Sequence, residues 1–439
     1  MKILKFGSAS IATAERIKDV LSIATKERGN IIVLSSIAGT AEALHEASNY
    51  LYKKNNEGAI EIINKLELDY IQLTSTLFET ESLRQEAVNK ITTTFDYIRT
   101  FSRNLFTLFE ERIVLAQGEL LLSDIFLLML SERNIKAALL PALEFMRTDK
   151  NAEPDAIFLK EKLSELLDSN KDAEIFITQG YICKNAYGEI DDLRKGGNDL
   201  SASLIGAAVN ADEIQIWADV DVMLNNDSKC VEGTTAIKQM NFDEAAELTY
   251  FGSKILHPSS VLPAKLANIP VRLLNTNTPD SPGTIISNKT EPHTVKAIAA
   301  REGITVIRVQ SGRMLLAHGF LRRILEVFED FQTPVDMLTT SEVGVSVTID
   351  NDSKLENIVD ELKKYGTVSV DSDMARVSVV GDLDWNKTGF GTQILDAVTE
   401  IPIRMVSYGG SNYNFSILIK TEDKTRTLQM MNQHFFGTK

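Results

Sequence analysis

Residues 194–199 (RKGGND) place two cations, two glycines and the expected start of a helix next to one another. Glycines let the backbone approach a ligand closely, and a helix N-terminus favours a negatively charged group. Asn198 or Asp199 could equally serve as a plain helix N-cap. As a local pattern, this segment is the strongest indication of an anion-binding site in the chain.

A second turn of small residues follows the first expected strand. Residues 5–10 read KFGSAS, with Lys5 at the strand end. Backbone N–H groups in such a turn can cradle phosphate oxygens, and Lys5 could add a full positive charge. The alternative is an ordinary strand-to-helix turn with a solvated lysine, and the turn alone does not decide between them.

Three further segments carry candidate groups, each of them a weak signal by itself. Glu119 lies in an apolar helical stretch, Asp219 follows an expected strand in the segment WADVD, and Lys254 lies in the segment FGSKILHP. Strand ends are where α/β folds bind ligands, so Asp219 could hold magnesium or a ribose and Lys254 could reach a nucleotide phosphate. A partly exposed helix residue is the simpler interpretation of Glu119.

The composition argues against several classes of protein. The 439 residues carry a formal net charge of −15, whereas nucleic-acid binding needs surplus Lys and Arg. The two cysteines and five scattered histidines support neither a disulfide framework nor a zinc site. No apolar run reaches the roughly 18 residues of a membrane span, and the N-terminus is unlike a signal peptide. We therefore expect a cytoplasmic protein with neither a nucleic-acid nor a membrane partner.

The elements that must position these residues alternate along the chain. Apolar strands without polar alternation are typical of a parallel sheet covered by helices on both faces. A turn-rich stretch at 275–283 precedes a domain boundary that we expect near residue 290. Residues 57–133 are expected to be almost wholly helical. The strands are expected at 2–6, 31–34, 137–140, 174–178, 213–217 and 270–274.

The C-terminal part contains an internal repeat. A Gly-Phe pair opens an expected helix at residues 319–320, and another does so at 389–390, which is 70 positions later. Each copy is followed by an expected strand, at 343–349 and at 413–419. Each copy is too small for a stable core alone, so we expect the two to pack side by side around one sheet.

Together, in this order and spacing, the motifs resemble those of aspartokinases in the amino-acid kinase family. The family reads KFGGTS, GEL, ITQG(F/Y)I, RGGSD, WTD and FG(A/S)K(V/I)LHP where this chain has residues 5–10, 118–120, 177–182, 195–199, 217–219 and 251–258. Residues 339–343 (TTSEV) resemble the family's first ACT module. The resemblance implies an α/β/α sandwich with a mostly parallel sheet in residues 1–290. Two ferredoxin-like ACT modules would follow in residues 291–439.

The resemblance also implies a reaction, the ATP-dependent phosphorylation of the L-aspartate side-chain carboxylate to 4-phospho-L-aspartate. This is the first step towards lysine, threonine and methionine. Lys5 and Asp199 would be catalytic, with Mg²⁺ between the phosphates of ATP. Glu119 would hold the substrate ammonium, and Lys195 a substrate carboxylate. The implied ATP contacts are Lys5, Phe6, Gly7, Ser8, Ala218, Asp219, Leu224, Lys229, Lys254 and Ile255. The implied substrate contacts are Ala41, Glu119, Lys195, Gly196, Gly197 and Asn198.

Several of these positions depart from the family's pattern. Ser8 replaces a glycine, Asn198 a serine, and Lys195 an arginine whose bidentate fork a lysine cannot reproduce. Ala218 and Ala41 replace threonines, and Leu224 replaces a tyrosine. A catalytically impaired homologue, which binds nucleotide or amino acid as a regulatory subunit, therefore stays open beside an active kinase.

The ACT modules imply feedback control by an amino acid, with lysine as the first expectation and threonine as the second. Asp336 would take the effector's ammonium. The alternative is that the implied residues only pack a module interface. Modules of this type usually build homodimers or higher homo-oligomers. The implied effector contacts are Met314, Phe320, Leu321, Val335, Asp336 and Ser341.

Overall fold

The computed structural model divides the chain into two compact units. Residues 1–222 and 255–288 form the first, and residues 223–254 and 289–439 form the second. The expected boundary at 290 leaves residues 223–254 in the N-terminal part, whereas the contacts group them with the second unit. The structure describes residues 1–103, 105–194, 196–219, 223–250, 256–292, 294–312, 318–384, 386 and 388–437.

The first unit is built on a mostly parallel sheet, as the sequence predicts. Its strands lie in the order β3-β4-β2-β1-β7-β9-β10, and only β10 is antiparallel to its neighbour. Every strand expected in this unit forms at its expected place. The bounds are β1 Lys2–Phe6, β2 Asn30–Leu34, β3 Ala137–Leu139, β4 Ile175–Gln179, β7 Glu213–Ala218, β9 Val271–Asn275 and β10 Thr284–Ser287.

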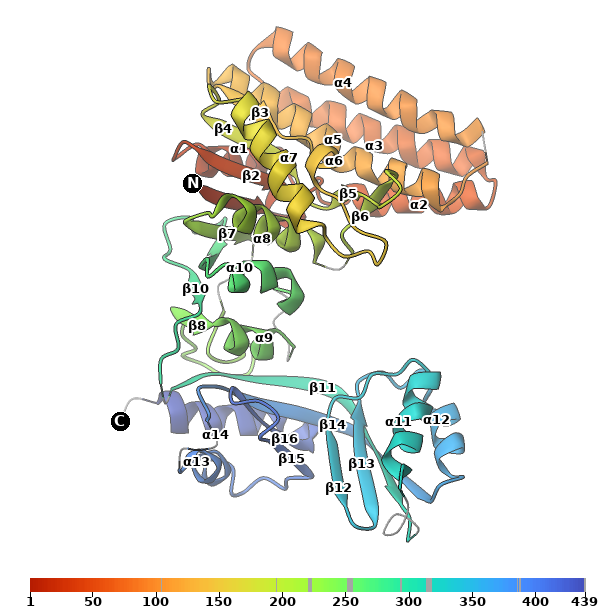
Figure 1. The fold of residues 1–439 in the computed structure, drawn as a ribbon, viewed down its shortest axis with the longest axis vertical. Coiled ribbons are helices and arrows are strands. Elements are labelled where there is room, and N and C mark those ends of the chain that lie inside the picture. Colours follow the sequence, from red (N-terminus) through yellow and green to blue (C-terminus); the bar gives the residue numbers. More distant parts are fainter. Residues whose placement is uncertain are drawn as a thin grey trace. The chain divides into compact units, whose positions relative to one another are not determined.

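Helices cover both faces of this sheet (Figure 1). The apolar faces of α1, α2 and α5 share one core with Leu4, Phe6 and Ile32 of the strands. On the opposite face, α8 approaches so closely that a Cβ at Gly206 would meet the Ile214 side chain 2.6 Å away. The stretch expected to be helical forms α3, α4 and α5. The bounds are α1 Ala14–Ala24, α2 Thr40–Tyr52, α3 Asn56–Leu77, α4 Glu81–Thr100, α5 Leu108–Glu132, α6 Ala142–Phe145, α7 Ala156–Ser169, α8 Gly197–Val209 and α10 Leu262–Leu266.

Helix α5 is mostly apolar from Leu120 to Leu130, because this part of it packs inside the core. By length and composition it could cross a membrane, yet 67% of its most apolar window is buried inside the protein. Thr107 caps its start with a reciprocal bond to Glu110. Gly118 lets α5 lie against α2, since a Cβ there would come within 2.9 Å of the Thr40 methyl group. The helix that carries Glu119 is therefore fixed in place by close packing.

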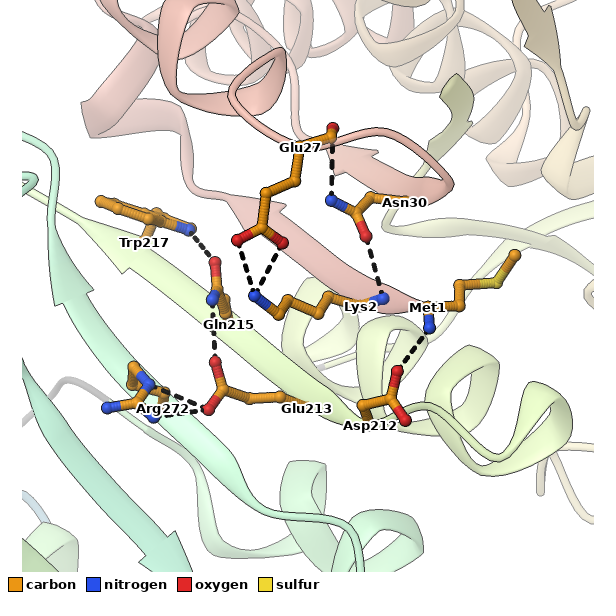
Figure 2. A network of polar contacts seen from close by, with 9 residues as sticks. All are labelled: Met1, Lys2, Glu27, Asn30, Asp212, Glu213, Gln215, Trp217 and Arg272. Atoms are coloured by element: carbon orange, nitrogen blue, oxygen red, sulfur yellow. Dashed lines mark hydrogen bonds and ion pairs between the residues drawn. The ribbon is translucent and has the colours of Figure 1, made fainter. Parts of the chain in front are cut away.

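A polar network ties the amino ends of β1, β7 and β9 together (Figure 2). Lys2 pairs with Glu27 at 2.7 Å, and Arg272 pairs with Glu213 at 2.7 Å. Burial alone raises the pKa of Glu213, but hydrogen bonds from Arg272 and Gln215 outweigh burial and hold this pKa below its usual value. The network thus fixes the amino ends of neighbouring strands, whereas the predicted site lies at their carboxyl ends.

The second unit holds an antiparallel sheet in the order β12-β13-β11-β14-β16-β15. Helices α11 and α12 pack on one half of it, and α13 and α14 on the other (Figure 1). Ile324 and Ile394, 70 residues apart, are both fully buried, so the repeat has equivalent positions in two cores. The bounds are β8 Gln239–Asn241, α9 Phe242–Tyr250, β11 Val295–Gln310, α11 Phe320–Asp330, β12 Leu338–Ser341, β13 Gly344–Ile349, α12 Leu355–Leu362, β14 Thr367–Gly381, α13 Phe390–Asp396, β15 Met405–Tyr408, β16 Asn414–Lys420 and α14 Lys424–Phe436.

Candidate active site

Lys5 and Asp199 form an ion pair at the carboxyl end of the parallel sheet. The distance from Lys5 Nζ to Asp199 Oδ1 is 2.7 Å, and each side chain is only 12% exposed. Lys5 comes from β1 and Asp199 from the first turn of α8, so the fold joins two motifs that are far apart in sequence. Because both charges are largely removed from water, the pair is held more firmly than a surface ion pair.

The turn after β1 lies close to this lysine. A Cβ at Gly7 would come within 3.5 Å of Lys5 Nζ, so the ammonium faces the backbone of the turn. Residues Ser8–Ile11 form a short 3₁₀ helix, and the Gly7 amide makes only a long 3.4 Å bond to the Trp217 carbonyl. The turn can therefore present N–H groups beside a positive charge, which is the arrangement that a phosphoryl group requires.

Glu119 is buried, with 5% of its surface exposed, which does not fit the simpler interpretation of a partly exposed helix residue. Burial raises its pKa to about 7, although backbone N–H groups of residues 180–182 and the charge of Lys5 act in the opposite direction. The Tyr181 amide donates to its carboxylate at 2.9 Å. A carboxyl group that is desolvated yet held by backbone donors is poised to receive a cation.

Glu119 lies in the wall of a cavity of about 370 Å³. Four residues predicted from the sequence line it, namely Ser8, Ala41, Glu119 and Asn198. The size suits a small amino acid. The other lining residues are Ser35, Ser36, Ile37, Glu42, His45, Arg112, Leu115, Ala116, Tyr181, Ile182, Asp191 and Asp192.

One wall of the cavity is a hairpin that sequence reasoning missed. Strands β5 (Ile182–Lys184) and β6 (Ile190–Asp192) pair antiparallel beside α5. Arg112 of α5 contacts Asp191 at 3.2 Å. Burial and the neighbouring Asp192, to which the hydroxyl group is hydrogen-bonded, raise the pKa of Tyr181. Arg112 lies two helical turns before Glu119 on the same face of one helix, but no local motif marks it as a site residue.

The glycines of the 194–199 segment are required by packing. Gly196 has a φ of +74°, and a Cβ there would clash with the Ser260 hydroxyl. A Cβ at Gly197 would lie 2.6 Å from the Tyr181 ring. A Cβ at Gly180 would clash with Asn198 Oδ1, so the Asn198 amide group packs against that turn. Lys195 lies outside the described residues.

The predicted nucleotide contacts are distributed over both units. Phe6 stacks on Trp217 with ring centroids 5.9 Å apart, and Ala218 and Asp219 follow at the end of β7. Asn277 donates to the Asp219 carbonyl at 3.0 Å, which holds this strand end in place. Leu224 and Lys229 belong to the second unit. Lys254 and Ile255 lie outside the described residues.

The predicted effector residues lie in the first ACT-like half of the second unit. Phe320 is buried at the start of α11, whereas Leu321 is 37% exposed. Val335 packs against the same core, the Asp336 amide donates to the Thr348 carbonyl at 3.0 Å, and Ser341 ends β12. Met314 lies outside the described residues.

Comparison with known proteins decides the family. The model of the amino acid kinase family matches residues 1–275, and that of the ACT domain matches residues 377–435. Aspartokinase 1, chloroplastic, of Arabidopsis thaliana is 30% identical over 99% of this chain and 80% of its own length. The chain belongs to the aspartokinases. The resemblance inferred from the motifs is thereby confirmed.

Bacterial aspartokinases agree with this assignment. The lysine-sensitive aspartokinase 3 of Escherichia coli is 32% identical over 74% of this chain and 75% of its own length. A crystal structure of E. coli aspartokinase III in complex with lysine and aspartate superposes with a TM-score of 0.85 and 28% identity, covering 99% of both chains. The complex of that enzyme with aspartate and ADP gives a TM-score of 0.78 at 27% identity. The predicted fold class, a kinase domain followed by paired ACT modules, is confirmed.

Proposed function

We propose that this chain is an aspartate kinase, which transfers the γ-phosphoryl group of ATP to the side-chain carboxylate of L-aspartate. The observation that carries the proposal is the buried Lys5–Asp199 pair beside a small cavity whose wall contains the buried Glu119. The reaction needs a cation that binds the phosphoryl group and a carboxylate that binds the substrate ammonium, both at the carboxyl end of the sheet. The structures of the E. coli relative with aspartate and with ADP support the same substrates.

The nucleophile in this reaction is already a carboxylate, so no strong general base is required. Catalysis then depends on positioning and on neutralising charge on the transferring phosphoryl group. Lys5 supplies that charge, and Asp199 holds the Lys5 ammonium in place across 2.7 Å. Ser8 belongs to the turn after β1 and also lines the cavity, so the turn proposed for the phosphates adjoins the space proposed for the amino acid.

The described residues fit ATP with its magnesium ion at the carboxyl end of the sheet. Mg²⁺ usually keeps several waters and is held by one or two carboxylates together with substrate phosphates. Asp219, with a side chain 34% exposed after β7, fits such a role, and Ala218 and Phe6 line the same strand ends. When bound, the ion would shield the phosphate charges from the incoming carboxylate.

The proposed activity is tested by incubating the purified chain with ATP, Mg²⁺ and L-aspartate. We expect formation of ADP and of an acyl phosphate that hydroxylamine traps, and much less of both with L-glutamate, whose extra methylene moves the reacting carboxylate away from the position that the L-aspartate carboxylate would take. An impaired homologue that acts only as a binding subunit would release no ADP above a blank without enzyme.

We further propose that lysine binds the second unit at the effector residues named above. Sensitivity to lysine in the E. coli relative supports lysine over threonine. Calorimetric titration should give heat with lysine and little with threonine, and Asp336→Ala should weaken lysine binding about tenfold or more by removing a charged partner. Heat from neither amino acid would leave these residues a packing role only.

A homodimer, a cytoplasmic location and a functional boundary near residue 290 stay predictions.

A further inference from the structure

We infer that Arg112 binds the α-carboxylate of the amino-acid substrate, in exchange for its present partner Asp191. The inference rests on the proposed function, because it names a residue that binds the substrate at the same site. Among the described residues that line the cavity, Arg112 is the one with a permanent positive charge.

The positions of Arg112 and Glu119 suit the two groups on the substrate's α-carbon. Both side chains come from α5 and line the same cavity. They are two helical turns apart, about 10 Å along the axis. The long Arg112 and Glu119 side chains can converge from this spacing, so that each reaches one of the two groups on a single carbon atom with a hydrogen bond of about 3 Å. Glu119 would then hold the ammonium and Arg112 the carboxylate.

The charges around the cavity show why a cation is needed at this place. The wall contains four carboxyl groups, on Glu42, Glu119, Asp191 and Asp192. A dicarboxylate that enters such a space is repelled unless a cation faces it. Arginine presents five N–H donors in a planar fork that matches a carboxylate, and the single 3.2 Å contact to Asp191 leaves several of them for a ligand. Its side chain is 30% exposed, so a ligand can reach it.

Asp191 acts in this arrangement as a competitor for the same guanidinium group. Its side chain is 17% exposed and lies on the short strand β6, in the hairpin wall of the cavity. The substrate carboxylate would replace it as the partner of Arg112, so one charged contact is exchanged for another of the same kind. Removing the charge of Asp191 should therefore strengthen aspartate binding, whereas removing Arg112 should weaken it.

The test is calorimetric binding of two ligands to the full chain. The ligands are L-aspartate and 3-aminopropanoate, which is aspartate without its α-carboxylate. Arg112→Ala should weaken L-aspartate binding about 10- to 100-fold and leave 3-aminopropanoate nearly unchanged. Arg112→Lys should give an intermediate loss, and Asp191→Asn should tighten L-aspartate binding. Arg147→Ala breaks a comparable pair with Asp155 outside this cavity and should change neither affinity.

Several results would overturn the assignment. They are unchanged L-aspartate affinity in both Arg112 variants, equal losses for the two ligands, or wild-type protein that does not bind L-aspartate. Weaker L-aspartate binding in both Arg112→Lys and Asp191→Asn would mean that the ion pair only stabilises the hairpin. ADP release is measured on the same samples. A wild-type protein that binds L-aspartate but releases no ADP contradicts the proposed function and leaves the role of Arg112 standing.

Discussion

Replacement of Lys5 by alanine should lower kcat for phosphoryl transfer by about 10²- to 10³-fold, the usual loss when one preorganised donor is removed from a transition state. Lys5 Nζ lies 2.7 Å from Asp199, beside the turn that is placed to receive the phosphates. The positive charge of Lys5 matters most in the transition state, when the phosphoryl group is between the leaving oxygen of ADP and the attacking oxygen of the aspartate carboxylate. KM for L-aspartate should therefore change much less than kcat.

The control for this variant is Lys2→Ala on the same strand. Lys2 also forms an ion pair, with Glu27 at 2.7 Å (Figure 2), but it lies at the amino end of β1, whereas Lys5 lies near the carboxyl end. The Lys2→Ala variant should retain nearly full activity. Asp199→Asn keeps a hydrogen-bonding group but no longer holds the Lys5 ammonium by charge, so we expect a smaller loss in kcat than for Lys5→Ala. Equal activity of Lys5→Ala and wild-type protein in ADP release would contradict this role.

The parallel sheet could be predicted because strands such as β2 and β4, with five buried residues each, leave no polar alternation in the sequence. The spacing of the two Gly-Phe pairs predicted the C-terminal repeat, and Ile324 and Ile394 fill equivalent positions in its two cores. The placement of residues 223–254 could not be predicted in this way. Val231 packs in the same core as Ile298, and such contacts between distant segments leave no local periodicity.

The residues of the candidate site that lie in a local motif of charged and small residues could be predicted from the sequence. Lys5 and Asp199 were both singled out from local segments, and the fold joins them. Arg112 and Asp191 were missed for a physical reason. The strands of the hairpin have three residues each, too few for an alternating pattern, and Arg112 looks like an ordinary charge near a helix start. Only the tertiary packing of α5 against β6 gives these residues a shared cavity.

Glu119→Gln should raise KM for L-aspartate about 10- to 100-fold, because a neutral amide replaces the carboxylate that receives the substrate ammonium. The pH dependence gives a sharper expectation. Burial raises the pKa of Glu119 to about 7 in the free protein. Only the ionised form attracts an ammonium group, so the affinity of wild-type protein for L-aspartate should rise between about pH 6 and pH 8. The glutamine variant should lack this rise.

The same shift in pKa predicts a change in stability that can be measured without substrate. The folded pKa of about 7 lies above the unfolded value near 4.5, so the folded chain holds the proton more tightly between these limits. The free energy of unfolding should therefore fall as the pH rises through this window, by roughly 3 kcal/mol from this one group. Urea unfolding at pH 5 and pH 8 should show the fall in wild-type protein and a smaller one in Glu119→Gln. If the free energy of unfolding changes equally in the two proteins between pH 5 and pH 8, Glu119 is ionised throughout. The rise in aspartate affinity would then need another titrating group.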